Sequence, residues 1–513
     1  MAGTAPRAPR SEGKVVRVVF IALMLDLLAF TMPLPLFPRL IEDFVNSEAR
    51  NPALNTTLLS QTLHAVRTLR AYLFSFASST SQARLAAFPA QWDLTILGGL
   101  LASLFSFCQF FISPFLGRLS DRYGRKKVLL VTMIGNLLSA ALWLKADSFG
   151  LYAASRLIGG LSEGNVQLSI ACITDVTSPA TRSRSLALVG FAFAIAFTVG
   201  PSLGAYFSSR TLGRGSVLAV PPALATLVPG LPEKVHLNSY AVPAAITLVL
   251  LTVETIYLGA CLPETRGWSK KVDEPTASTA TKPTSPPVSR SPAERLARLR
   301  RLQFIHFAFL FFLAGAEFTL CFLTHNIFDY SNLQNGRLLG VIGILSSLLQ
   351  GGYVRRRTST PAKTAALALS GVRTCAVSLA LLAVLPPRRS PRGAKQALWA
   401  AAAGLAYVSA TVVNSLNALA SFETDPEPSS SSSPSSTAAP SDPRLEKGVA
   451  LGRFRSRGQL GRAIGPLVTT SLYFVVSPSV AYSVCGVGIL GAAAGMARVV
   501  REEKLKEKEA KKE

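Results

Sequence analysis

The chain has 513 residues, of which 49% are hydrophobic and only 16% are charged, and its mean hydropathy is +0.36. Apolar runs of about 20 residues, the length that spans a bilayer, recur along the chain, so the composition excludes an ordinary soluble domain and indicates a multi-pass helical membrane protein. The net charge of +25 is high enough to raise nucleic acid as a partner, and the distribution of that charge decides against it.

Twelve membrane-spanning helices are predicted, in two groups of six. The first apolar run is too long for a cleavable signal peptide and has no small-residue cleavage site, so we expect it to be a span. The first six spans are predicted near 15–41, 94–116, 128–147, 150–174, 185–207 and 241–262. The other six are predicted near 302–324, 335–353, 364–385, 397–420, 458–476 and 479–498. The fold class is therefore an all-α membrane protein with two six-helix bundles.

The segments around the spans divide the chain further. A helix from about Leu54 to Phe76 is expected to lie in the outer membrane interface, because its apolar residues follow three-and-four spacing. Ser291-Pro292-Ala293-Glu294 forms a capping box and predicts a short basic helix over 294–301 on the membrane surface. The predicted parts are a cytoplasmic tail (1–14), a first bundle (15–262) with an outer loop (42–93), a flexible cytoplasmic linker (263–301), a second bundle (302–498) with a disordered insert (423–447), and a charged cytoplasmic tail (499–513).

The distribution of Lys and Arg predicts the orientation. Segments on one predicted side hold 34 of the 53 Lys and Arg residues, and segments on the other side hold 11. By the positive-inside rule both termini are cytoplasmic, and the basic excess reflects topology and an anionic membrane surface rather than nucleic acid. The membrane itself, plasma membrane or an endomembrane such as a vacuole or vesicle, stays open. Asn55-Thr56-Thr57 is the only N-glycosylation acceptor pattern, and it falls on the outer side.

No pattern for a cofactor, a metal or an enzyme is found. The six cysteines lie in or at apolar spans without metal-ligand spacing, so neither zinc nor a structural disulfide is expected. Gly160-Leu161-Ser162-Glu163-Gly164 matches the nucleophile elbow, but it lies in an apolar helix without the preceding strand and histidine partner that this motif needs. Without a phosphate-binding loop, a proton gradient is the expected source of energy.

The segment Gly117 to Lys127 places a charged turn between the second and third spans. Its sequence, G-R-L-S-D-R-Y-G-R-K-K, resembles the loop between helices 2 and 3 of the major facilitator superfamily. The resemblance implies that Asp121 engages the start of helix 11 and that Arg125 meets Asp175 at the end of helix 4, as a latch between the two halves. The expected latch residues are Gly117, Asp121, Arg122, Gly124, Arg125 and Asp175.

Several charged residues fall inside predicted spans. A carboxylate such as Asp26 near the midplane costs about 2.5–3.5 kcal/mol and is a functional candidate by default. Arg156, Glu163 and Gln167 are spaced to share one face of the fourth span. We expect a central polar cavity whose carboxylates bind and release protons; the alternative is that the charges only hold helices together. The candidates are Asp26, Arg156, Glu163, Asn165, Gln167, Glu317, Asn414 and Asn417.

Gly200-Pro201-x-x-Gly204 in the fifth span is similar to the signature of drug/proton antiporters in that superfamily, although Ala196 and Ala205 replace its flanking glycines. The two halves show weak sequence similarity at corresponding positions. The glycine- and arginine-rich segment 351–357 at the end of the eighth span corresponds to 117–127 at the end of the second, but it lacks the acidic residue. Such repetition is typical of transporters built from two six-helix repeats.

Stretches around Asp26, Arg156, Glu317 and Arg462 resemble the eukaryotic tetracycline-transporter-like branch of the superfamily. This resemblance implies twelve helices, alternating access and transport of organic anions or drug-like molecules. We expect a monomeric secondary transporter. We expect proton-coupled export, with the bilayer, the substrate and protons as partners. The alternatives are a facilitative organic-anion carrier and a non-transporting membrane scaffold or chaperone.

Overall fold

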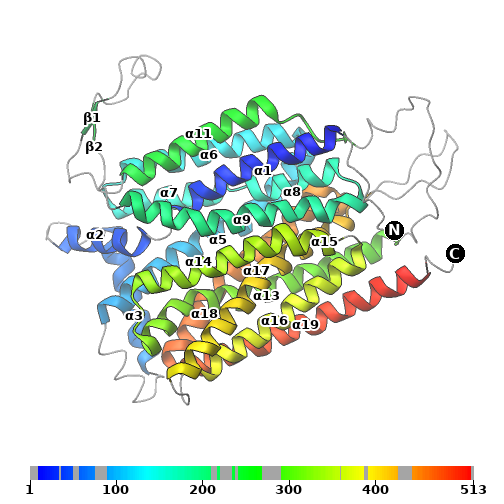
Figure 1. Cartoon of the computed structure of the whole chain (residues 1–513). Helices are drawn as coiled ribbons and strands as arrows, with labels where there is room; N and C mark the ends of the chain where they lie inside the picture. Colours follow the sequence, from blue (N-terminus) through cyan, green and yellow to red (C-terminus); the bar gives the residue numbers. More distant parts are fainter. Residues whose placement is uncertain are drawn as a thin grey trace.

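The structure is a computed structural model of the chain (Figure 1). It describes residues 10–33, 36–49, 57–75, 89–208, 217–219, 234–236, 241–268, 290–358, 360–385, 391–425 and 442–509. The glycosylation pattern at Asn55, most of the linker and the middle of the serine-rich insert lie outside these ranges. Both termini lie at one end of the bundle, named here the termini end, and the opposite end is named the loop end (Figure 1).

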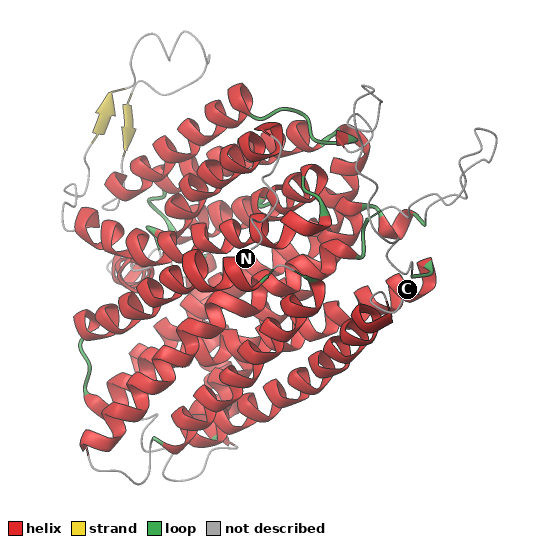
Figure 2. Cartoon of the chain, turned by 45° about the vertical axis from the view of Figure 1, so that its right-hand side comes forward, coloured by secondary structure: helices red, strands yellow, loops and turns green. Residues whose placement is uncertain are grey.

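The predicted all-α membrane fold is confirmed, because helices form nearly all of the described chain (Figure 2). The first bundle contains α1 (Arg10–Thr31), α5 (Pro89–Tyr123), α6 (Arg125–Lys145), α7 (Phe149–Ser162), α8 (Asn165–Val176), α9 (Pro179–Ser208) and α11 (Ala241–Cys261). The second contains α13 (Pro292–Phe328), α14 (Asn332–Leu348), the π-helical η3 (Leu349–Val354), α15 (Arg355–Arg357), α16 (Pro361–Val384), α17 (Pro391–Phe422), α18 (Lys447–Val475) and α19 (Pro478–Glu509).

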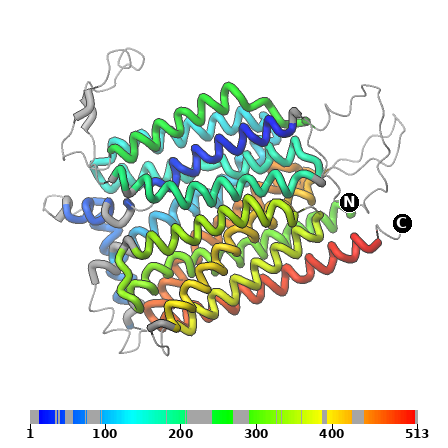
Figure 3. The backbone as a smooth tube through the Cα atoms, in the orientation of Figure 1, coloured from blue at the N-terminus to red at the C-terminus, as the bar shows by residue number. Residues whose placement is uncertain are grey.

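The two bundles meet along α18, which packs against α5 of the first bundle and α13 of its own. They also meet along α9, which packs against α14 and α17 (Figure 3). Within the described residues, nine helices are long and apolar enough to cross a membrane. The other helices that run through the bundle are α1, the pair α7 and α8, and α18. α7 and α8 have 14 and 12 residues, so each is too short to cross a membrane alone. The charged residues of α1 and α18 lower the apolar character of these two helices.

The loop end carries α2 (Phe37–Ala49), α3 (Leu58–Ser75) and a hairpin of β1 (Val217–Ala219) with β2 (Lys234–His236). The helix expected over 54–76 is therefore present as α3. The first span, expected to run to residue 41, was predicted wrongly: α1 ends at Thr31 and α2 begins at Phe37. The intervening Met32-Pro33-Leu34-Pro35-Leu36 explains the break, because proline removes a helix hydrogen bond and disfavours helix before it.

Two more boundaries differ from the prediction. The basic segment 294–301 is not a separate surface helix, because α13 runs without interruption from Pro292, with Ser291 and Glu294 forming the predicted capping box. The eleventh span begins at Lys447 rather than 458. The ends of the insert 423–447 are ordered, as η4 (Pro443–Leu445) leads directly into α18.

Candidate functional site

The fourth span is broken near the middle of the bundle. α7 ends at Ser162 and α8 begins at Asn165, and Glu163 between them has an extended backbone with ψ of 95°. The prediction that Arg156, Glu163 and Gln167 share one helical face is therefore wrong, since the break interrupts the helical repeat. Broken helices in membrane proteins are tolerated where they border a site, and they expose a helix start inside the bundle.

The start of α8 lies beside Asp26. The Asp26 side chain is only 4% exposed, and Asn165 Nδ2 donates a hydrogen bond of 2.7 Å to its Oδ1. Asn165 also contacts Met133 Sδ at 3.1 Å and accepts from Thr132 at 3.4 Å. Because a helix start favours negative charge, α8 and Asn165 together support a carboxylate at this position. The structure thus brings two predicted residues from distant spans into direct contact.

An arginine that the sequence reasoning missed faces these acids from the second bundle. Arg455 of α18 interacts electrostatically with Glu163 and with Asp26, and its Nη2 lies 3.5 Å from Gln109 Oε1 of α5. It was missed because the eleventh span was expected to begin at 458. The available signal was the series of arginines at 453, 455, 457 and 462, of which 455 and 462 are two helical turns apart and share a face.

The other polar candidates have other partners. Gln167 Nε2 donates to Ser113 O at 2.9 Å. Arg156 lies over the rings of Trp143 and Tyr152, with its Cζ 5.8 and 5.5 Å from their centroids. No ion pair joins Arg156 to Asp26 or Glu163 in the described part of the chain. These two side chains stabilise contacts within the first bundle.

In the second bundle, Glu317 of α13 is exposed and interacts electrostatically with Arg462 of α18. Asn414 Nδ2 of α17 donates to Gln350 Oε1 at 3.2 Å and lies against Gly190 of α9, where a Cβ would come within 1.7 Å of it. Asn417 is half-buried. Asn414 therefore lies against α9 and η3 rather than beside Asp26.

At the termini end, Asp121 accepts hydrogen bonds from the first turn of α18. Its Oδ1 accepts from Gly448 N at 3.0 Å and its Oδ2 from Val449 N at 2.7 Å. A carboxylate at a helix start satisfies amides that have no partner within the helix and interacts favourably with the helix dipole. Arg125 Nη1 also lies 2.7 Å from Asp121. This contact explains why α18 extends to Lys447.

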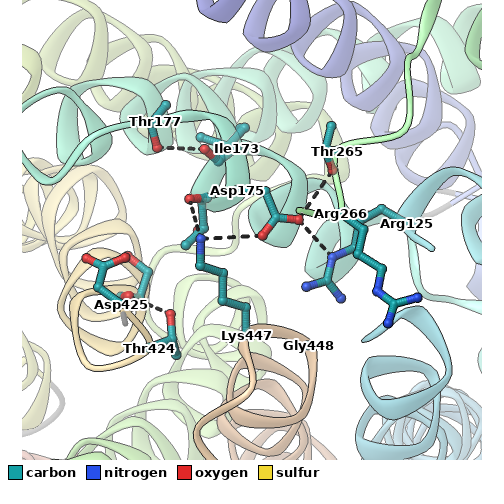
Figure 4. A network of polar contacts seen from close by, with 12 residues as sticks. Arg125, Ile173, Asp175, Thr177, Thr265, Arg266, Thr424, Asp425, Lys447 and Gly448 are labelled. Atoms are coloured by element: carbon teal, nitrogen blue, oxygen red, sulfur yellow. Dashed lines mark hydrogen bonds and ion pairs between the residues drawn. The ribbon is translucent and has the colours of Figure 1, made fainter. Parts of the chain in front are cut away.

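Asp175, at the end of α8, connects both bundles (Figure 4). Its Oδ2 lies 2.9 Å from Arg125 Nε of its own bundle, and its Oδ1 lies 3.5 Å from Lys447 Nζ of the second. Thr265 Oγ1 donates to the same carboxylate at 3.3 Å. Glu446, which precedes α18, is exposed, and partial desolvation together with the nearby Asp121 raises the pKa of its carboxyl. The buried Arg125 and Asp175 lie where the bundles meet along α18.

The glycines of the predicted latch permit close backbone approach. A Cβ on Gly117 would lie 2.1 Å from Gly448 O, so α5 and α18 touch backbone to backbone. Gly124 has φ of 102°, which favours glycine, and Glu264 accepts from Arg125 N beside it at 2.8 Å. Arg122 is exposed and lies over Tyr123. Of the predicted latch residues, only Arg122 is directed away from the contact.

A second contact between the bundles was not predicted. Arg182, at the start of α9, is 2% exposed, and its Nη1 lies 2.6 Å from Asp425 Oδ2 just after α17. The same guanidinium donates to Thr177 O at 3.0 Å and lies over the Phe422 ring. The sequence contains no motif for this pair, because the two residues are 243 positions apart.

The glycines of the antiporter-like pattern pack against α1. A Cβ on Gly200 would lie 1.9 Å from Thr31 Oγ1, and one on Gly204 would lie 1.9 Å from Met32 O. α9 runs through Pro201 without ending. In this structure the pattern lets α9 approach the end of α1 closely, where Thr31 also donates to Ala196 O at 2.9 Å.

Residues 19–439 match the family profile of the Major Facilitator Superfamily. The chain belongs to this superfamily. It is 34% identical to mouse Major facilitator superfamily domain-containing protein 10 and 32% identical to the human protein, in each case over 94% of this chain and 93% of the relative. It is also 32% identical to the class H tetracycline resistance protein of Pasteurella multocida, over 21% of this chain and 26% of that protein.

Among solved structures, the chain is similar to the human organic anion transporter MFSD10 (TETRAN), with a TM-score of 0.70, 28% sequence identity, and coverage of 95% of this chain and 100% of that one. The fucose:proton symporter FucP of Escherichia coli has a TM-score of 0.54 at 11% identity and shows a shared fold only, covering 95% of this chain and 99% of that one. The predicted family and branch are confirmed. The protein is a multi-pass transporter of the major facilitator superfamily and not an enzyme.

Proposed function

We propose that this transporter carries small organic anions by alternating access and couples their movement to protons. The observation that carries the proposal is the arrangement at the centre, where Arg455 of one bundle faces Asp26 and Glu163 of the other. The similarity to a human organic anion transporter supports the substrate class. Asp26 is hydrogen-bonded and buried, so whether its carboxyl group is ionised depends on the charged and polar groups around it.

The coupling between substrate and protons would follow because Arg455 interacts both with the substrate anion and with the two carboxylates. An anionic substrate that binds Arg455 removes the charge that otherwise stabilises the ionised forms of Asp26 and Glu163. These carboxylates then bind protons more readily, so substrate and proton occupancy become linked. This linkage favours loading of an anion and a proton together. Export in exchange for protons, as the sequence analysis expects, stays a prediction.

For orientation, we propose that the termini end is cytoplasmic, in accord with the Lys and Arg distribution. The contacts of Asp121, Asp175 and Arg182 would then hold the cytoplasmic side closed in this state. Alternating access would require these contacts to break as the bundles rotate. Breaking a charged pair costs free energy unless water solvates both charges as they separate. The plasma membrane and endomembranes both remain candidate locations.

The test is substrate flux in proteoliposomes with and without an imposed pH gradient, across a panel of organic anions and drug-like amphiphiles. Asp26→Asn and Arg455→Gln are compared with Arg457→Gln, because Arg457 is an exposed arginine on the same helix. Gradient-driven flux should fall by about 10²-fold in Asp26→Asn, a typical contribution of a positioned proton-transfer group. Arg455→Gln should weaken anion binding, and Arg457→Gln should behave as wild type.

The outcomes separate the alternatives. Wild-type flux that ignores the pH gradient would identify a facilitative carrier. Normal flux in Arg455→Gln would remove the proposed anion site while leaving transport itself intact. An absence of flux from well-folded protein across the whole panel would support the non-transporting scaffold and overturn the proposal.

A further inference from the structure

One buried carboxylate of the first bundle is not used by the proposed site. Glu254 of α11 is 1% exposed, and its Oε2 has no hydrogen-bond partner in the described residues. It interacts electrostatically with Asp26 and Glu163. An unpartnered carboxylate in a membrane bundle costs several kcal/mol when ionised, as an order of magnitude, so its presence calls for a reason other than packing.

Glu254 occupies a position in the apolar stripe that α11 turns toward its bundle. The buried residues of α11 follow a three-and-four repeat that includes Ala244, Thr247, Leu251, Glu254 and Leu258. A stripe of this spacing packs best with apolar side chains throughout. A leucine would fit the pattern at position 254, so the glutamate there lowers the stability of the folded protein relative to leucine.

The register between α11 and α1 places Glu254 relative to Asp26. Thr247 Oγ1 of α11 donates to Ala29 O of α1 at 3.4 Å, and the two helices run in opposite directions (Figure 1). Glu254 lies two turns farther along the same face of α11, about 10 Å toward the termini end. That level corresponds to Ala22 of α1, so Glu254 lies about one helical turn nearer the termini end than Asp26.

The surroundings leave Asp26 and Glu163 as the charges that act on Glu254. α6 and α9 also pack against α11, but neither places a charged group in electrostatic range of Glu254 within the described residues. Toward the termini end, the next stripe residue is Leu258, which is 2% exposed, followed by Leu262 at 1%. These leucines separate Glu254 from the termini end while the bundles are closed there.

We propose that Glu254 is the proton-exchange partner of Asp26 on the termini side of the membrane. This inference rests on the proposed proton coupling. When the bundles separate at the termini end, water reaches the Glu254 carboxylic acid, which gives its proton to that water and becomes a carboxylate. The Asp26 carboxylic acid then gives its proton, through an intervening water, to the Glu254 carboxylate, so that Asp26 becomes ionised and Glu254 is neutral again before the bundles close. The reverse order loads Asp26, and Leu258 prevents exchange in the closed state.

The experiment measures two processes in the same proteoliposomes: substrate–substrate exchange without a pH gradient, and proton movement reported by a trapped pH-sensitive dye. The variants are Glu254→Gln, Glu254→Asp and Glu254→Leu. Glu12→Gln is the matched control, because Glu12 is a carboxylate of the same bundle at 4% exposure whose oxygen accepts from Thr181 at 2.8 Å. Thermal unfolding of each purified variant reports its stability.

Glu254→Gln and Glu254→Leu should keep substrate exchange and lose gradient-driven proton movement by at least about tenfold. Glu254→Asp should retain part of it, and Glu12→Gln should retain all of it. The leucine variant should unfold at a higher temperature than wild type, so lost coupling there would not reflect misfolding. Wild-type coupling in the folded leucine variant would overturn the inference while leaving the proposed function intact. Wild-type protein without gradient-driven flux would overturn both.

Discussion

Two charged turns occupy corresponding positions in the two halves, 117–127 at the end of α5 and 351–357 after α14, and they differ in how they contact the opposite bundle. We call them the first and the second corner. At the end of α5, Gly117 touches Gly448 backbone to backbone and Asp121 holds the first amides of α18. At the end of α14, the chain forms the π-helical turn η3 and then Arg355–Arg357, whose side chains are exposed. The repeat therefore preserves the turn and its basic residues. The second corner packs against α9 of the first bundle through apolar side chains such as Val354, whereas the copy with an acid hydrogen-bonds to the start of a helix of the opposite bundle.

The two bundles also differ at the centre of the protein, in the sign of the charges that they supply. The first bundle supplies the buried acids Asp26, Glu163 and Glu254, whereas the second supplies Arg455 and Arg462 on α18. At the centre, acids of the first bundle thus face arginines of α18. A ligand or a proton that changes one side alters the attraction between the two, which is the physical requirement for coupling binding to a change of state.

The largest expected effect is a steric one that separates the two corners. In Gly117→Val, the new Cβ would meet Gly448 O at 2.1 Å, and backbone on both sides leaves little room to adjust. We expect α5 and α18 to separate and transport to be lost. Gly352→Val is the control, because a Cβ there meets nothing within 4 Å. Equal flux in the two variants would contradict the difference between the corners.

Removal of the Asp121 charge should have the next largest effect. Asp121→Asn weakens two charge-assisted hydrogen bonds to the start of α18, and such bonds contribute about 1.5–3 kcal/mol each. Hydrogen–deuterium exchange at Gly448 and Val449 should therefore accelerate, with little change at the distant end of α18. If these two amides stay as protected as in wild type, the carboxylate does not hold the helix start.

A smaller effect is expected at the contact between Arg182 and Asp425. Arg182→Gln removes the charge pair but leaves Asp425 26% exposed, so water compensates for part of the loss. We expect weaker closure at the termini end, seen as faster exchange of the α17 end, and a smaller effect than that of Asp121→Asn because water reaches Asp425. A larger effect than that of Asp121→Asn would reverse the proposed ranking of the two contacts.

The smallest effect should come from the exposed arginines of the second corner. Arg356→Gln removes an exposed charge that makes no ion pair in the described residues. Transport and thermal unfolding should both match wild type, since isolated surface charges contribute little. A transport defect with normal folding would show that the second corner also takes part in the change of state.

Much of the architecture was predictable from the sequence, because its signals are local. Span length, apolar composition and the position of basic residues act within one helix and its flanks. They predicted the two bundles, a separate helix at Leu58–Ser75 and the capped start of α13. The errors occurred where two local signals disagreed. The apolar run continued past Met32, but the prolines there ended the first span early. The arginines of α18 lowered the hydropathy of its first turns, so its beginning at Lys447 was not predicted.

The candidate site was only partly predictable. The sequence singled out Asp26, Glu163 and Asn165 because charge and polarity inside a span are costly wherever the partner is. It could not assign the partners, since those depend on which helices are neighbours and on the break at Glu163. Arg156 illustrates this, because its spacing suggested the central site and its actual neighbours are the rings of Trp143 and Tyr152.

By itself, then, the sequence determined the membrane class, the two-bundle plan and the family, through patterns that a single helix or turn contains. Only the tertiary structure decided that Asp121 binds the start of α18, that Arg182 meets Asp425 and that Arg455 faces the acids of the first bundle. Each of these contacts joins residues hundreds of positions apart. Their energies depend on distance and burial in space, which no local pattern along the chain encodes.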